Sequence, residues 1–325
     1  MKGKHIVKVA DNRVRYQFEL VRNITIVQGN SGTGKTTLFE MIAAYARLHE
    51  KSGVRLTCDK PCISLRPDSD WENILSNISD SIVFIDEDAD YVSSRQFSAV
   101  MKASDNYYVF FSREPLYNLP YSAEEIYEIK TSGKYHTFKR RYTQSKKGCV
   151  YATATNSQNS EVILTEDSHA GFCLYQNLYK DTQVECISAG NNSNIFNWLG
   201  EHHAKKTFVI ADGAAFGAEM NRVMALQRQF ADRITICLPE SFKWLILKSG
   251  LIDIPGLKKI LDNPSDFIES GQYLSWENFF TDCLVRNTSG TYYAYSKAHL
   301  NSYYVVKGNS KKIVELIASN MPESE

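Results

Sequence analysis

Residues 29–36 read Gly29-Asn30-Ser31-Gly32-Thr33-Gly34-Lys35-Thr36. The glycines in this stretch allow the backbone to turn so that successive N–H groups point at one anion. Residues 23–28 before it are rich in β-branched side chains, and residues 37–48 after it carry apolar side chains at helical spacing. A helix that starts here directs its positive end at the same anion. The pattern therefore predicts a strand–loop–helix unit that holds a chain of phosphates.

The stretch resembles the Walker A loop of P-loop NTPases, since it matches G-x-x-x-x-G-K-[ST]. The resemblance implies ATP and Mg²⁺ as cofactors, with Lys35 on the β- and γ-phosphates and the Thr36 hydroxyl on Mg²⁺. The implied nucleotide contacts are Gly29, Asn30, Ser31, Gly32, Thr33, Gly34, Lys35, Thr36 and Thr37. The alternative is a glycine-rich turn that matches by chance. The flanking strand and helix and a second motif downstream disfavour it.

That second motif is the apolar run at residues 82–85, which is followed by Asp86 and Glu87. Four consecutive apolar residues are typical of a parallel strand that is buried on both faces. The strand resembles the Walker B strand of P-loop NTPases, which implies that Asp86 holds Mg²⁺ and that Glu87 polarises the attacking water. An ordinary buried strand that ends in a solvated acidic turn is the alternative.

A third apolar run, at residues 107–111, ends at Ser112 and Arg113. In P-loop NTPases with an extra strand between Walker A and Walker B, this strand often ends in a polar sensor of the γ-phosphate. Ser112 stands at that position, and Arg113 beside it is a candidate for stabilising charge in the transition state. A surface ion pair between Arg113 and Glu114 is the competing interpretation.

Composition sets the broad class of the protein. The chain has 325 residues, of which 43% are hydrophobic, and Lys+Arg equals Asp+Glu at 37 each. This length favours two domains, and the zero net charge argues against a general polyanion-coating protein. The seven cysteines form no zinc pattern, no signal peptide begins the chain, and no apolar stretch is long enough for a membrane span. We therefore expect a cytoplasmic protein with reduced thiols and no membrane partner.

The sequence predicts an α/β protein with two domains. The first, residues 1–145, is a P-loop parallel sheet preceded by a β-hairpin over residues 5–20. A polar stretch at 146–160 is the expected linker, and residues 161–325 form a second α/β domain, in which strands and helices alternate up to about residue 245. Beyond residue 260 the sequence is less informative: residues 291–295 and 303–306 are strand-like. Packing is the favoured role of the tyrosines there, and a surface on which nucleic-acid bases stack is the alternative.

The second half resembles the Toprim domain of topoisomerases, primases and OLD-type nucleases over residues 160–245. One strand ends at Glu166, the next at Gly190-Asn191-Asn192, and the third at Asp212. The resemblance implies that Glu166 and Asp212 are metal ligands. The family's second Asp in the third motif is Ala214 here, so at most one divalent ion is expected. A generic flavodoxin-like or Rossmann-like α/β domain with acidic loops is the alternative.

In broad arrangement, a P-loop ATPase joined to a Toprim-like domain resembles OLD-type nucleases and related phage-defence ATPases. Three functions are compatible with the sequence. The first is a slow Mg²⁺-dependent ATPase that controls the second domain, with Glu87, Lys35, Ser112 and Arg113 as its catalytic residues. The second is an ATP-gated nucleic-acid binder or nuclease, and the third is an interaction module with a structural nucleotide. Nucleic acid, a partner protein or further copies of the chain are the partners these functions imply.

Overall fold

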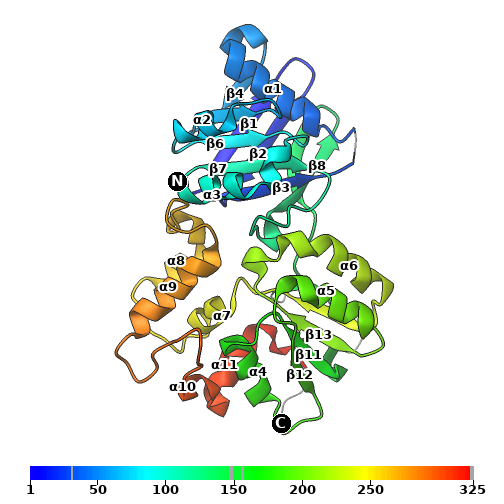
Figure 1. Cartoon of the computed structure of the whole chain (residues 1–325), viewed down its shortest axis with the longest axis vertical. Coiled ribbons are helices and arrows are strands. Elements are labelled where there is room, and N and C mark those ends of the chain that lie inside the picture. The colour runs from blue at the N-terminus through cyan, green and yellow to red at the C-terminus, as the bar shows by residue number, and fades with distance from the viewer. Residues whose placement is uncertain (31, 146–148, 155–156, 323–325) are drawn as a thin grey trace. The chain divides into compact units, whose positions relative to one another are not determined.

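The computed structural model describes residues 1–30, 32–145, 149–154 and 157–322, and these residues form two compact α/β units (Figure 1). The first unit combines Met1–Tyr142 with the later segment Asp262–Leu274. The second combines Thr143–Leu261 with Ser275–Glu325. The expected α/β class is confirmed.

The first unit is built on a mixed sheet that contains nine strands in the described part of the chain, in the order β4-β1-β2-β9-β8-β3-β7-β6-β5. In chain order the strands are β1 (His5–Ala10), β2 (Arg15–Leu20), β3 (Ile24–Gln28), β4 (Arg55–Thr57), β5 (Cys62–Leu65), β6 (Ile82–Ile85), β7 (Tyr107–Ser112), β8 (Ile126–Ser132) and β9 (Tyr135–Arg140). The unit's α-helices are α1 (Lys35–Leu48), α2 (Trp71–Ser76) and α3 (Arg95–Ala103). Short 3₁₀ turns are η1 (His49–Ser52), η2 (Asp90–Ser93), η3 (Ala123–Glu125) and η7 (Pro264–Asp266).

Half of this sheet is parallel and half is not. Strands β5, β6, β7, β3 and β8 run parallel to their neighbours, and β7 lies between β3 and β6. The β1–β2 pair is antiparallel, as the expected hairpin requires, and β4 extends it on the other side of β1. Strand β9 joins the two halves, because it pairs with β8 in antiparallel and with β2 in parallel.

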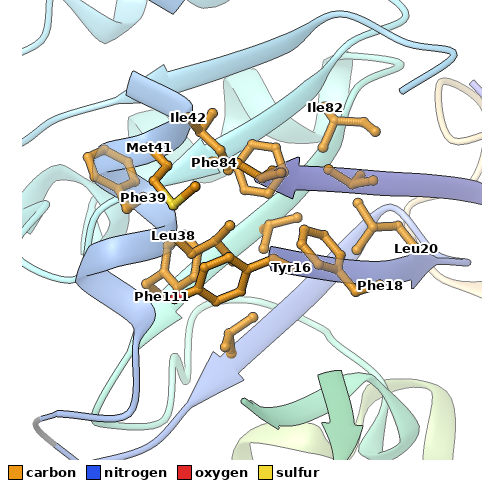
Figure 2. Close-up of a cluster of buried hydrophobic side chains, with 14 of the residues drawn as sticks. Tyr16, Phe18, Leu20, Leu38, Phe39, Met41, Ile42, Ile82, Phe84 and Phe111 are labelled. Carbon is orange, nitrogen blue, oxygen red and sulfur yellow. The ribbon is translucent and has the colours of Figure 1, made fainter. Parts of the chain in front are cut away.

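Strand alternation explains how the sheet is covered. On β2, Tyr16, Phe18 and Leu20 are buried while the residues between them are exposed, and the buried set packs toward Leu38 of α1 and Phe111 of β7 (Figure 2). The side chains of β7 alternate between the two faces of the sheet, and every second one points to the face away from α1. Tyr108 and Phe110 contact Phe97 of α3, with ring centroids 6.3 and 6.1 Å away. Both faces of the parallel half are thus buried, which is why β3, β6 and β7 are buried along their whole length and mostly apolar.

The second unit has a smaller sheet, with five strands in the described residues and the order β10-β14-β13-β11-β12. Its strands are β10 (Val150–Ala152), β11 (Val162–Thr165), β12 (Glu185–Ser188), β13 (Thr207–Ile210) and β14 (Ile234–Cys237). Its helices are α4 (Ala170–Leu178), α5 (Asn192–Glu201), α6 (Met220–Gln229), α7 (Phe242–Lys248), α8 (Leu257–Asp262, at the unit boundary), α9 (Trp276–Thr288), α10 (Ser302–Val305) and α11 (Lys307–Ala318), with 3₁₀ turns η4 (Ser157–Asn159), η5 (Gly213–Ala215) and η6 (Gly217–Glu219). All strands except the antiparallel β10 are parallel, so β11, β12 and β13 end at the same edge.

The unit boundaries differ from those expected. Within the stretch predicted as a linker at 146–160, strand β10 pairs with β14 and so extends the second sheet, while 146–148 and 155–156 lie outside the described residues. The segment Asp262–Leu274 belongs to the first unit, where Ser270 donates hydrogen bonds to the carbonyls of Met1 and Asp105. Contacts this distant in the chain leave no local signal in the sequence.

The strands expected at 291–295 and 303–306 are wrong. Residues 291–295 form a turn, and α10 (Ser302–Val305) covers most of the second range. Two of the tyrosines responsible for the strand signal are packed in the core, Tyr295 and Tyr304 at 5% and 0% exposed, whereas Tyr292 is 76% exposed. No helix in the described part of the chain is both long and apolar enough to cross a membrane.

Gly213 marks a tight approach in the second unit. A Cβ atom there would lie 2.9 Å from the carbonyl oxygens of both Leu238 and Pro239. We expect Gly213→Ala to lower the free energy of unfolding by roughly 1–3 kcal/mol, because rigid backbone must move. Gly200 on α5 has nothing within 4 Å of the same position, so Gly200→Ala should be neutral or stabilising by about 0.5–1 kcal/mol. Urea unfolding checks both, and equal stability of the two variants would contradict the packing described.

Candidate functional sites

The loop between β3 and α1 surrounds a buried ammonium group. Lys35 is the first residue of α1, and its side chain is 4% exposed. Its Nζ donates to the Gly29 carbonyl and lies 3.4 Å from the Asn30 carbonyl. Gly32 and Gly34 have φ of 82° and 94°, which side chains rarely adopt, so the two glycines are required for the turn. The expected strand–loop–helix geometry is present.

A pocket of about 350 Å³ opens at this loop, and we call it the loop pocket. Most of the residues singled out from the sequence line it together: Asn30, Gly32, Thr33, Gly34, Lys35, Thr36, Thr37, Glu87 and Arg113. Gly29, Asp86 and Ser112 are not among its described lining residues, and Ser31 lies outside the described residues. Residues from three separate stretches of the chain therefore meet here because β3, β7 and β6 are adjacent.

Glu87 connects the two cations of the loop pocket. Its Oε1 accepts a 2.6 Å hydrogen bond from Arg113, and its Oε2 lies 3.5 Å from Lys35 Nζ. The Arg113 hydrogen bond holds the pKa of Glu87 below its usual value, and the charge of Lys35 adds to this lowering. Glu87 is thus ionised at neutral pH. The buried Oε2 has no closer hydrogen-bond donor among the described residues, so it can accept a proton or a hydrogen bond from a ligand.

Asp86 and Ser112 precede the lining residues Glu87 and Arg113 in the chain but are not among the described residues that line the pocket. Asp86 follows β6 directly, and burial raises the pKa of its carboxyl group, with the charges of Asp88 and Glu87 adding to the rise. The Ser112 hydroxyl donates to the Glu114 carbonyl at 2.5 Å, so it points toward the backbone of the segment that follows β7. Arg113 is 60% exposed and pairs with Glu87 rather than with Glu114.

Three pocket residues come from strands that carried no functional signal in the sequence. The Tyr16 hydroxyl donates to the Gly34 carbonyl at 3.1 Å, and its ring stacks on His136 with centroids 4.5 Å apart. His136 Nδ1 lies 2.9 Å from the Thr131 hydroxyl. A Cβ at Gly34 would be 2.9 Å from Tyr16 Oη. A tyrosine in a strand whose polar and apolar residues alternate is normally interpreted as a core residue. Sequence alone could therefore not assign the contact between Tyr16 and the Gly34 carbonyl.

The second unit brings Glu166 and Asp212 together, as expected from the strand ends. Glu166 follows β11, and its Oε2 accepts the backbone N–H of Asp212 at 3.0 Å. With its amide nitrogen facing Glu166, Asn192 donates to both carboxylate oxygens at 2.8 and 3.2 Å. Ala214, where the Toprim resemblance leads one to expect a carboxylate, is 3% exposed.

A lysine that sequence reasoning missed completes this cluster. Lys243 on α7 donates to Asp212 Oδ2 at 3.2 Å and to Glu277 Oε1 at 2.8 Å, with its side chain 3% exposed. Burial and the charge of Asp212 raise the pKa of Glu166 to about 8, whereas Asp212, whose pKa burial raises to about 6, is held ionised by the Lys243 ammonium. We call these four residues the carboxylate–lysine cluster. The cluster places one ammonium group between two carboxylates, beside the Glu166 carboxyl group.

Metal-ligand geometry is absent from the described residues: they contain no group of three or more His, Cys, Asp and Glu side chains arranged to hold a metal ion. All seven cysteines lie within the described residues and are free thiols. Comparison of the chain with protein-family models, with curated proteins and with solved structures found no match.

The carboxylate–lysine cluster predicts that Lys243 is needed for stability. Lys243→Met should lower the free energy of unfolding by about 3 kcal/mol, the lower end for breaking a buried ion pair, because Asp212 and Glu277 are each about one-fifth exposed. Lys258→Met, at an exposed position on α8, is the control and should have little effect.

Adding Asp212→Asn to Lys243→Met tests the cause, because it removes one of the carboxylates left unpaired. The double variant should recover part of the lost stability in urea unfolding. Additive losses from the two substitutions would mean that Lys243 does not stabilise the fold through Asp212.

Proposed function

We propose that the chain binds ATP and hydrolyses it slowly with Mg²⁺ in its first unit, in the manner of P-loop NTPases. The observation that carries this proposal is the buried Lys35 ammonium at the loop pocket. Its partners are two carbonyls and one carboxylate at 3.5 Å, which are ligands that a phosphate chain can replace. The position of β7 between β3 and β6 supports the same class, because it matches the arrangement with an extra strand between the two Walker motifs.

Each pocket residue has a separate task in this proposal. Lys35 and the backbone N–H groups of the loop bind the β- and γ-phosphates. Thr36 and Asp86 would hold Mg²⁺, which neutralises phosphate charge when bound. Glu87 orients a water molecule and takes its proton as the water oxygen attacks the γ-phosphorus and the bond to the β-phosphate oxygen breaks, giving ADP and phosphate. Arg113, released from Glu87, stabilises the charge that develops on the transferred group.

For the second unit we propose a Toprim-like element that binds or signals rather than cuts. Two-metal chemistry needs several oxygen ligands around adjacent ions. Here Ala214 offers no oxygen, burial and the charge of Asp212 raise the pKa of Glu166 and so disfavour its charged form, and Lys243 already pairs with Asp212 at 3.2 Å. The lysine thus stands where a cation is needed by the remaining carboxylates. The proposed role of the unit is to respond to the ATP state of the first unit.

Lys35→Ala should abolish ATP binding and turnover, because it removes the one ammonium group of the loop pocket that is aimed at the phosphates. Lys51→Ala removes an exposed lysine three residues beyond α1 and is the matched control, with affinity unchanged. Isothermal calorimetry with ATP and Mg²⁺ measures binding, and phosphate release measures turnover. Unchanged ATP affinity in a folded Lys35→Ala protein would refute the proposed function.

Glu87→Gln should keep ATP binding and slow hydrolysis by roughly 10²–10⁴-fold, the usual contribution of a general base. The amide retains the size of the side chain and can still contact Arg113, but it cannot take a proton from water. Single-turnover hydrolysis of bound ATP isolates this step from nucleotide exchange. If Glu87→Gln hydrolyses ATP normally while Asp86→Asn does not, the base has been assigned to the wrong carboxylate.

A further inference from the structure

The antiparallel half of the first sheet has a second, separate feature on its outer face. A hollow of about 840 Å³ lies over β4, β1, β2, β9 and β8, and we call it the basic hollow. Its lining includes Lys8, Arg15, Arg55 and Lys130 but no Asp or Glu among the described residues. On these strands the exposed residues alternate with buried ones, so the four cations share the face that is turned away from α1.

The strand register aligns these side chains in two rows across the sheet. In one row, Arg55 pairs with Ala10, Ala10 with Arg15, and Arg15 with Tyr135. In the other, Lys8 pairs with both Thr57 and Gln17 on its two neighbouring strands, and further along the sheet Lys130 pairs with Thr137. Because neighbouring strands are about 4.8 Å apart, Arg55 and Arg15 stand roughly 10 Å from each other. The cations therefore form a track rather than a single anion site.

None of the four cations forms an ion pair with a carboxylate of the described residues, unlike other arginines of the same unit. Arg66 pairs with Glu40, Arg113 with Glu87, and Arg140 with Glu124. Like charges gathered without counter-charges repel one another and destabilise the folded state. Such a patch is explained if a polyanion supplies the missing charge.

An exposed aromatic ring lies among these cations. Tyr135 is 55% exposed, the Arg15 guanidinium lies 5.9 Å from its ring centroid, and the Lys134 ammonium lies 5.7 Å away. Cations that track a backbone, combined with an exposed aromatic ring on which a base can stack, are the features that bind single-stranded nucleic acid. An acidic polypeptide has no base to stack on Tyr135, and the stacked bases of a duplex cannot reach it.

We infer that the basic hollow binds single-stranded nucleic acid, with its phosphates along Arg55, Arg15 and Lys8 and one base on Tyr135. The site is distinct from the loop pocket. Tyr16 and His136 line both, but the Tyr16 ring is on the inner face, where its hydroxyl meets Gly34. The inference does not depend on the proposed ATPase, because none of its four cations lines the loop pocket.

The test is fluorescence anisotropy of the full chain with a labelled 20-nucleotide strand over a range of salt concentrations. Arg15→Ala/Arg55→Ala should weaken binding more than tenfold at 50 mM salt. It should also make the slope of log K against log salt shallower by about 1.4, which is twice the 0.7 expected per phosphate contact. The matched control is Arg47→Ala/Arg95→Ala, which removes two exposed arginines from α1 and α3 and should bind like wild type.

Tyr135→Ala separates stacking from charge. It should weaken binding about fivefold to a hundredfold with an unchanged salt slope. Lys35→Ala should bind the strand like wild type, so that a failure of ATP binding is distinguished from a failure of this inference.

Four results would overturn the inference: no strand binding by wild type at 50 mM salt, equal losses in the double variant and its control, equal binding of a duplex or polyglutamate, or displacement of the strand by saturating ATP. The last result would assign the hollow to the nucleoside of ATP.

Discussion

A buried ammonium group must be compensated, and this constraint organises both candidate sites. Lys35 and Lys243 are 4% and 3% exposed, each in a different unit. Burial of an unpaired charge costs several kcal/mol, so each lysine must have partners built by the fold. The chemical nature of those partners decides what each lysine can do. Lys35 is held by carbonyls and by one carboxylate at a distance, which leaves most of its charge available to a ligand, whereas Lys243 is neutralised by two carboxylates.

The first sheet places two different surfaces back to back on the same strands. On β2, Tyr16 faces inward to the Gly34 carbonyl, and Arg15 faces outward beside Tyr135. On β9, His136 stacks on Tyr16, while Tyr135 stays exposed. A shift of one residue in the register of either strand would move its inward-facing side chains to the outer face and its outward-facing side chains to the inner face. The pairing of β2 with β9 therefore fixes the wall of the loop pocket and the track of cations together, and any movement of β2 would be felt on both sides.

Much of the first unit could be predicted from sequence because its signals are local. Residues 23–48 contain the strand, the glycine turn and the helix in one continuous stretch, and the apolar runs at 82–85 and 107–111 are typical of buried parallel strands. Strand β9 has no comparable signal, because Tyr135–Arg140 is basic, contains no apolar run, and has only exposed and partly buried residues. The tyrosines of residues 291–306 have strand propensity, yet tertiary packing places them in a turn and in α10.

The site in the second unit shows why a motif at strand ends predicts where its residues lie better than it predicts which chemistry they can perform. Glu166 and Asp212 meet because β11 and β13 are neighbouring parallel strands, and that follows from the alternation of elements. Lys243 and Glu277 come from α7 and α9, outside the pattern of strand ends, and no spacing rule connects them to Asp212. The backbone N–H of Phe242 also donates to Asp212 Oδ1 at 2.9 Å, so α7 begins at this carboxylate and brings its second residue against it. Asp212 and Glu277 are thereby compensated by one positive charge. A lysine on the adjoining helix supplies that charge. Because a side chain, unlike a bound ion, cannot dissociate from the protein, the cluster is a permanent part of the fold.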